Sequence, residues 1–170
     1  ALIERAYQQS LEYAMVRKQG RAPGAPAGES SPIVQHPDVK RMLATMKSTI
    51  EALRRIIYWN AACLDIAAHH PDAAEREKAA DMAALLTPIS KGWGTDMSVD
   101  LTGMAVQIHG GMGFIEETGV AQHYRDARIT TIYEGTNGIQ AMDLVGRQLG
   151  MKGGAVVLSL LDDMDAMEAK

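Results

Sequence analysis

The sequence predicts an all-α fold, an antiparallel, up-and-down four-helix bundle with additional short helices. Apolar residues recur every three or four positions along most of the 170 residues, which is the period of an amphipathic helix. Hydrophobic residues make up 46% of the chain and aromatic residues only 5%, with 11 Met and a single Phe. The core must therefore be built from the aliphatic and Met side chains that packed helices prefer. No segment alternates as a β-strand would, and no internal repeat is present.

A first helix is expected from the N-terminus, where the apolar residues fall on one stripe. That stripe consists of Ile3, Ala6, Tyr7, Leu11 and Ala14. Residues 17–32 are rich in Gly, Pro and Ser and must form a loop. The loop is long for a compact domain, so we expect it to be either mobile or held by something outside the chain. Because the chain starts inside a helical pattern without an initiator Met, we also expect it to be part of a longer polypeptide.

The strongest helical pattern begins at Asp38 and has an apolar residue at nearly every turn. Its stripe comprises Val39, Met42, Leu43, Met46, Ile50, Leu53, Ile57, Ala61 and Leu64. Another helix is expected after Pro71, with acidic residues in its first turn. Pro88 interrupts this second pattern, which then continues to Ile108. Because proline removes a backbone donor and crowds the preceding turn, either a kink or a break is expected there.

The last third of the chain alternates helices with Gly-containing loops. Residues 109–119 are expected to form a loop and residues 120–129 a short helix. A longer helix should follow, with Thr136 or Asn137 as its N-cap. Its apolar residues are Ile139, Met142, Val145 and Leu149. After residues 150–154 we expect a final amphipathic helix that carries Val156, Val157, Leu160, Leu161, Met164 and Met167.

Charge and cysteine content argue against several classes of function. The formal net charge is −4 with both signs mixed along the chain, whereas a nucleic-acid surface normally shows a basic excess. No apolar run is long enough to span a bilayer, and no signal peptide opens the chain. The single Cys63 cannot form an internal disulfide, which favours a reducing compartment. His69 and His70 point apart on a helix, so no metal site is expected.

Two Gly-containing loops stand next to helix ends, QIHGGMG at residues 107–113 and YEGTNG at residues 133–138. Glycines in such places let backbone N–H groups approach an anionic ligand closely. Most loops of this kind in helical bundles are nevertheless simple turns or helix C-caps. Glu134, taken by itself, would likewise more often be a surface carboxylate.

Three ordered elements decide between these interpretations, namely QIHGGMGF at residues 107–114, RDARI at residues 125–129 and IYEGTNGIQ at residues 132–140. YAMVRKQG at residues 13–20 precedes them. Together they resemble the C-terminal signature of the acyl-CoA dehydrogenase family. The resemblance implies that residues 1–150 form that family's C-terminal helical bundle domain. Residues 151–170 would be a C-terminal helical extension, the start of a segment that continues in the full-length protein.

The resemblance further implies an FAD-dependent oxidoreductase that converts an acyl-CoA thioester to a trans-2-enoyl-CoA. Glu134 falls on the Glu of the Y-E-G-T motif and would remove the α-proton, while the β-hydrogen leaves as hydride to the flavin. Gly135 would lie against the substrate. The long loop before Pro32 and the residues of the last motif resemble those of a bacterial branch of the family with longer chains. That branch includes 3-methylthiopropanoyl-CoA dehydrogenase-like enzymes as well as enzymes of fatty acid metabolism.

The same resemblance implies a set of cofactor contacts, with an Arg guanidinium at the FAD pyrophosphate and Gly-rich backbone at the adenosine end. The residues expected to contact FAD are Arg17, His36, Gln107, Ile108, His109, Gly110, Gly111, Thr136 and Gly138. The contacts of residues 107–111 would be made through the side chain of Gln107 and through the backbone.

The resemblance also implies partners. They are an acyl-CoA substrate, an electron-transfer flavoprotein or similar acceptor, and identical subunits in a homodimer or homotetramer, in the bacterial cytoplasm. Two other functions remain open at this point, a non-catalytic helical interaction module of the same fold and an acyl-CoA oxidase. Because the family's other domains are absent, we expect the isolated chain to fold but to bind FAD weakly or not at all. We expect it to show no turnover.

Overall fold

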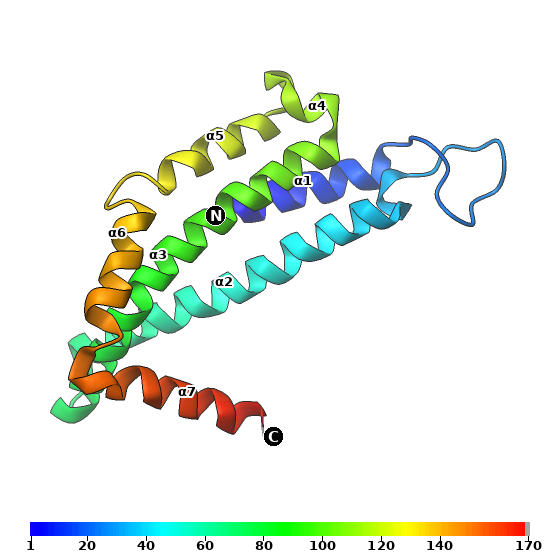
Figure 1. The fold of residues 1–170 in the computed structure, drawn as a ribbon. Coiled ribbons are helices and arrows are strands. Elements are labelled where there is room, and N and C mark those ends of the chain that lie inside the picture. Colours follow the sequence, from blue (N-terminus) through cyan, green and yellow to red (C-terminus); the bar gives the residue numbers. More distant parts are fainter. Residues whose placement is uncertain (169–170) are drawn as a thin grey trace. The chain divides into compact units, whose positions relative to one another are not determined.

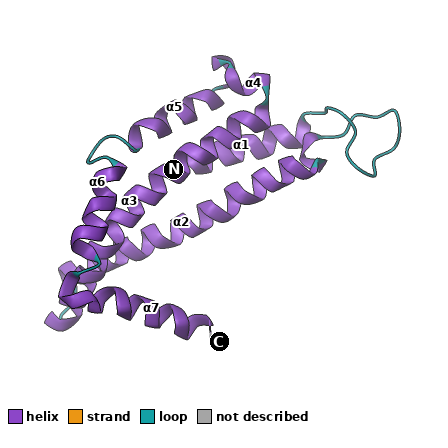
Figure 2. Ribbon diagram, viewed as in Figure 1, coloured by secondary structure: helices purple, strands orange, loops and turns teal. Residues whose placement is uncertain are grey.

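The computed structural model describes residues 1–168, which form helices joined by turns, with no β-strand in that range (Figures 1 and 2). The all-α prediction is therefore confirmed. The chain divides into two compact units. Unit 1 comprises residues 1–52 and 95–131, and unit 2 comprises residues 53–94 together with the chain from residue 132 onward. None of the helices within residues 1–168 is long and apolar enough to cross a membrane.

Unit 1 packs four helices around one core. They are α1 (Leu2–Val16), the first part of α2 (Pro37–His69), the last part of α3 (Ala73–His109) and α5 (Val120–Thr130). Helix α1 contacts each of the others. The centroid of the Tyr7 ring lies 5.7 Å from the Lys47 ammonium of α2, and Tyr13 stacks on His109 of α3. Gln9 forms a hydrogen bond with His123 of α5. The buried residues of α1 are Ile3, Ala6, Ser10 and Ala14, which confirms the predicted stripe in its main positions.

The loop between α1 and α2 is held at its base by the chain itself. Lys18 and Pro32 form an isolated β-bridge, the Gln19 N–H donates to the Ser31 carbonyl at 3.0 Å, and the Ser31 N–H donates to the Gly20 carbonyl at 2.8 Å. The short 3-10 helix η1 (Ile33–Gln35) then leads into α2. Figure 1 shows the rest of the loop projecting beyond the end of α1. The chain's own paired backbone groups therefore close the base of the loop, and the expectation that the loop is mobile or held from outside stays a prediction.

Unit 2 contains the remaining parts of α2 and α3 and the C-terminal elements. These are α6 (Asn137–Asp143), the π-helical turn η3 (Leu144–Gln148), η4 (Met151–Gly154) and α7 (Ala155–Glu168). Leu53 lies next to Gly94, and Asn60 next to Thr87 and Ser90, so α2 and α3 run antiparallel here. The core of the unit consists of Cys63, Met82, Ala83, Leu85, Leu86 and Val156.

The long α2 stripe is buried only in its first half. Met42, Leu43, Met46, Ile50 and Leu53 are buried, whereas Ile57 is 48% and Leu64 55% exposed. The periodicity predicted the helix correctly. It did not predict which turns of the helix other elements cover, because burial depends on residues distant in the sequence.

Two other expectations are resolved by the local backbone. Helix α3 is continuous from Ala73 to His109, so Pro88 does not break it. The predicted loop at residues 109–119 contains two short helical segments, α4 (Gly111–Phe114) and η2 (Glu116–Thr118). The Thr118 hydroxyl donates to the Met112 carbonyl and so ties these two turns together. The helix predicted at residues 120–129 is present as α5.

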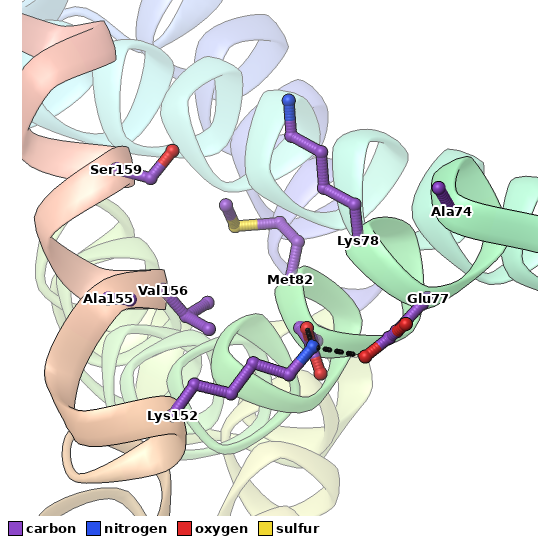
Figure 3. Close-up of a pocket in the computed structure, with 9 residues that line it drawn as sticks. Ala74, Glu77, Lys78, Met82, Lys152, Ala155, Val156 and Ser159 are labelled. Atoms are coloured by element: carbon purple, nitrogen blue, oxygen red, sulfur yellow. Dashed lines mark hydrogen bonds and ion pairs between the residues drawn. The ribbon is translucent and has the colours of Figure 1, made fainter.

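In unit 2, η4 is fixed to α3 by an ion pair cluster (Figure 3). The Lys152 ammonium lies 2.7 Å from a Glu77 carboxylate oxygen and also contacts the Asp81 carboxylate. These three residues line one side of a pocket of about 310 Å³, and Val156 of α7 and Met82 line it as well. The cluster therefore attaches the start of the C-terminal helix to the body of unit 2.

Candidate functional site

Unit 1 carries a cleft of about 350 Å³ where the C-terminal ends of α1 and α3 meet η1 and the start of α2. Six of the residues predicted to contact FAD line it: Arg17, His36, Gln107, Ile108, His109 and Gly110. The other lining residues are Tyr13, Gln19, Gly20, Ile33 and Val39. No carboxylate is among them, so every polar group of the cleft is neutral or cationic. This chemistry suits an anionic ligand such as a pyrophosphate.

Arg17 stands at the C-terminal end of α1, where the chain leaves the helix with φ −69° and ψ 120°. Its N–H donates to the Tyr13 carbonyl at 2.9 Å, and its carbonyl accepts from the Ile33 N–H at 2.8 Å. The backbone of Arg17 is thus fixed on both sides. Within residues 1–168 no carboxylate pairs with its guanidinium, which leaves the charge available to an anion.

His36 forms the opposite wall through a bond to the loop that follows Arg17. Its Nε2 lies 2.8 Å from the Gln19 carbonyl oxygen. Because a carbonyl oxygen only accepts, Nε2 carries the hydrogen and donates it in this bond. Gly20 has a φ of +61° and lies against the same imidazole, with its Cβ position 3.6 Å from the ring. The histidine therefore holds the segment after Arg17 close to the start of α2.

The turn after α3 depends on glycine for two different reasons. Gly110 adopts φ 58° and ψ −138°, a conformation open essentially to glycine alone. At Gly113 an added Cβ would lie 2.2 Å from the Val106 carbonyl oxygen, so only glycine fits. Nothing lies within 4 Å of a Cβ built at Gly110 or Gly111, and both are exposed. The backbone of this pair is accordingly open to a ligand.

His109 and Ile108 are buried, so their side chains belong to the core of unit 1. The His109 Nδ1 lies 2.8 Å from the Ala105 carbonyl oxygen and must donate to it. The ring stacks on Tyr13, with 4.3 Å between ring centroids and 24° between planes. Burial lowers the pKa of His109 below its usual value, which keeps the ring neutral at neutral pH. Any contact of these two residues with a ligand would be made through their backbone.

Four predicted site residues belong to unit 2, with Glu134, Gly135 and Thr136 in the loop before α6 and Gly138 in the first turn of that helix. Glu134 has a φ of +54° and Gly135 a φ of +83°, so two consecutive residues lie in the left-handed region. Thr136 is the N-cap, and its hydroxyl oxygen accepts from the Ile139 N–H at 3.3 Å. Of the two alternatives left by the sequence, Thr136 is therefore the N-cap.

Asn137 anchors this loop to α3, a role that the sequence patterns did not indicate. Its Oδ1 accepts from the Lys91 ammonium at 2.8 Å, and its Nδ2 donates to the Gly92 carbonyl at 3.1 Å. The Gln140 amide also approaches the Glu134 carbonyl oxygen, at 3.4 Å. The Glu134 side chain itself is exposed and pairs with no other group in residues 1–168. The loop is thus fixed through its neighbours, and the carboxylate is left free.

Comparison with known proteins places these features in a family. The family model described as "Acyl-CoA dehydrogenase, C-terminal domain" matches residues 1–149. The chain belongs to the acyl-CoA dehydrogenase family, as its C-terminal domain. The prediction from the ordered motifs is therefore confirmed, and the family consists of FAD-dependent dehydrogenases.

Relatives agree with this membership. A 3-methylmercaptopropionyl-CoA dehydrogenase of Ruegeria pomeroyi is 48% identical over 170 residues, which are 100% of this chain and 29% of the relative. The solved butyryl-CoA dehydrogenase of Megasphaera elsdenii is 32% identical, with a TM-score of 0.66 over 87% of this chain and 33% of that one. The structure of PigA in complex with FAD is 25% identical, with a TM-score of 0.69 over 89% of this chain and 33% of that one. The chain thus spans a third or less of the length of these three proteins.

Proposed function

We propose that this chain is the C-terminal domain of an FAD-dependent acyl-CoA dehydrogenase that converts an acyl-CoA thioester to a trans-2-enoyl-CoA. The observation that carries the proposal is the loop of Glu134, a strained backbone that holds an unpaired carboxylate inside the family's motif. Strained non-glycine residues gather at functional sites, where the surrounding structure fixes them. A scaffold protein would have no use for this arrangement.

Glu134 is the proposed catalytic base. Its carboxylate takes the α-proton of the acyl group, and the electron pair left behind forms the double bond as the β-hydrogen departs with its own pair. FAD, when bound, supplies the acceptor for that hydride. The backbone N–H of Glu134 would donate to the thioester carbonyl oxygen, which stabilises the negative charge that develops there. Gly135 has no side chain and would leave room for the substrate.

The cleft of unit 1 is the proposed site for part of FAD. Arg17 would meet the pyrophosphate, whose oxygens match the two-pronged guanidinium. Gln107 and the backbone of Ile108, His109, Gly110 and Gly111 would meet the adenosine end. The absence of carboxylates from the lining and the open backbone of the two glycines support this assignment. His36 would border the same cleft, while Thr136 and Gly138 would lie beside the flavin.

The names of two relatives suggest which acyl-CoA is the substrate. The relative that is 48% identical over this whole chain is named for 3-methylmercaptopropionyl-CoA, and the solved relative of Megasphaera elsdenii for butyryl-CoA. We therefore propose a short acyl-CoA, with 3-methylthiopropanoyl-CoA as the first candidate. An electron-transfer flavoprotein or similar acceptor would reoxidise the flavin, and the full-length protein would assemble as a homodimer or homotetramer.

The test is an assay of the full-length protein and its Glu134→Gln variant with a panel of acyl-CoAs and an artificial electron acceptor. The panel runs from butyryl-CoA to palmitoyl-CoA and includes 3-methylthiopropanoyl-CoA. We expect turnover to fall by about 10²- to 10⁴-fold in the variant, as is typical when a general base is removed. Bound FAD, measured by its absorbance, should be unchanged, because Glu134 is not among the proposed FAD contacts.

Glu117→Gln is the matched control, since Glu117 is an exposed carboxylate of the same chain that lies outside both proposed sites. It should turn over substrate like the unaltered protein. Full activity in the Glu134→Gln variant would overturn the assignment of the base. Stoichiometric FAD without turnover of any thioester would instead favour the interaction module of the same fold.

A further inference from the structure

We propose that Tyr13 and His109 form a positioning pair that sets the Arg17 guanidinium against the turn at residues 107–111. The inference rests on the proposed function, since it takes the cleft of unit 1 to be a site for the anionic part of FAD. It concerns two residues whose side chains are not proposed to touch the reacting atoms. Their role is to fix the distance between the two walls of the cleft.

Tyr13 is rigidly coupled to Arg17. The two residues are one helical turn apart on α1, and the Arg17 N–H donates to the Tyr13 carbonyl at 2.9 Å. A displacement of Tyr13 therefore moves the end of the helix from which the guanidinium extends. The Arg17 carbonyl in turn accepts from the Ile33 N–H. A displacement of Tyr13 is therefore passed on to both Arg17 and Ile33 at this end of the cleft.

His109 is coupled in the same way to the second wall. It is the last residue of α3 and directly precedes Gly110 and Gly111. Its ring is 4% exposed, and the bond from Nδ1 to the Ala105 carbonyl fixes its orientation. The adjoining glycines have no side chains to pack, so His109 is the residue next to them whose buried side chain attaches this turn to the core of unit 1.

The ring stack joins these two ends directly. The centroids of Tyr13 and His109 lie 4.3 Å apart, and both residues line the cleft. Within residues 1–168 it is the one contact between two aromatic rings. The Tyr13 hydroxyl has no hydrogen-bond partner among those residues, so the ring rather than the hydroxyl must carry the effect. A phenylalanine at position 13 would keep the stack, whereas an alanine at either position would remove it.

The experiment uses flavin fluorescence to measure the dissociation constant for FAD of the full-length apoprotein and of its variants. We expect Tyr13→Ala and His109→Ala to weaken FAD binding by about three- to tenfold, the range of one aromatic pair. The double variant Tyr13→Ala/His109→Ala should be no weaker than either single one, because both remove the same contact. Tyr13→Phe keeps the ring and loses only the hydroxyl, so it should restore the affinity to within about twofold.

Tyr7→Ala is the matched control, because Tyr7 is a partly buried tyrosine of the same helix that faces Lys47 instead of the cleft. It should bind FAD like the unaltered protein. An FAD affinity in Tyr13→Ala equal to that of the unaltered protein would overturn the inference, as would a Tyr13→Phe variant that binds FAD as weakly as Tyr13→Ala. Arg17→Ala distinguishes the two proposals. If this variant alone binds FAD more weakly, the cleft is still supported as an FAD site, and the positioning role of Tyr13 and His109 is overturned. An unaltered apoprotein that binds no FAD overturns both.

Discussion

Glu134 and Lys152 are the two non-glycine residues with positive φ in residues 1–168, and both belong to unit 2. Their φ angles are 54° and 52°, and each is followed by glycine with positive φ. The left-handed conformation costs a residue with a Cβ about 1 to 2 kcal/mol. The sequence places the two residues in similar surroundings, at turns that lead into a helix, yet different contacts hold them.

Lys152 is held by its own side chain. Its ammonium pairs with Glu77 and Asp81, and Figure 3 shows the side chain stretched across to α3. Glu134 is held by its neighbours Asn137 and Gln140, and its carboxylate contacts no group of the described chain. At Lys152 the strained backbone thus accompanies an ion pair cluster that attaches η4 to α3. At Glu134 it leaves a charged group available, as a reactive carboxylate requires.

The largest expected effect is that of Glu134→Gly, which should make the chain more stable and the full-length protein less active. Glycine adopts a φ of +54° without strain, so the free energy of unfolding of the 170-residue chain should rise by about 1 kcal/mol. Turnover of the full-length protein should fall by about 10²- to 10⁴-fold, because the base is gone. Urea unfolding and the acyl-CoA assay measure the two effects. A less stable variant would show that no strain is stored at this residue.

A smaller effect is expected at the next position of the same loop. Gly135→Ala places a Cβ 3.0 Å from the Gln140 amide nitrogen at a φ of +83°, so it should destabilise the chain by about 1 to 2 kcal/mol. Gly146→Ala is the control, because Gly146 lies in the helical turn η3 with nothing within 4 Å. It should stabilise the chain slightly. Equal urea midpoints for the two variants would contradict the strained loop.

The smallest effect is expected at Lys152, whose charges are exposed to solvent. Lys152→Met keeps the strained backbone and loses both ion pairs, whereas Lys152→Gly relieves the strain as well. The methionine variant should therefore have the lower urea midpoint of the two. Its loss relative to the unaltered chain should shrink at about 1 M salt, which screens exposed charges. Lys78→Met serves as the control, since Lys78 lines the same pocket without a paired carboxylate.

The pH dependence of the Lys152 cluster follows from the same charges. The Asp81 and Glu77 carboxylates raise the pKa of Lys152 above its ordinary 10.5, so the folded chain holds that proton more tightly than the unfolded one. The stabilisation is fully present below about pH 10.5 and is lost as the pH rises through the higher folded value. The difference between Lys152→Met and the unaltered chain should accordingly disappear in strongly alkaline solution.

The sequence by itself determined the helices, most of their ends and the family. Apolar residues at helical spacing predicted α1, α2 and α3, because burial of one stripe is what stabilises a helix in a small domain. Thr136 was one of two N-caps expected from the residue type alone. The ordered glycine-containing motifs identified both candidate loops, since a motif preserves the residue types that a site needs.

Only the tertiary structure decided the contacts between distant segments. The stack of Tyr13 on His109, the anchoring of Asn137 at Gly92 and the ion pairs of Lys152 each join residues far apart in the chain. The positive φ of Glu134 belongs with them, because no local preference favours it and anchored neighbours must hold it. Local patterns report the energy of a segment alone, whereas these features depend on what other segments bring to it.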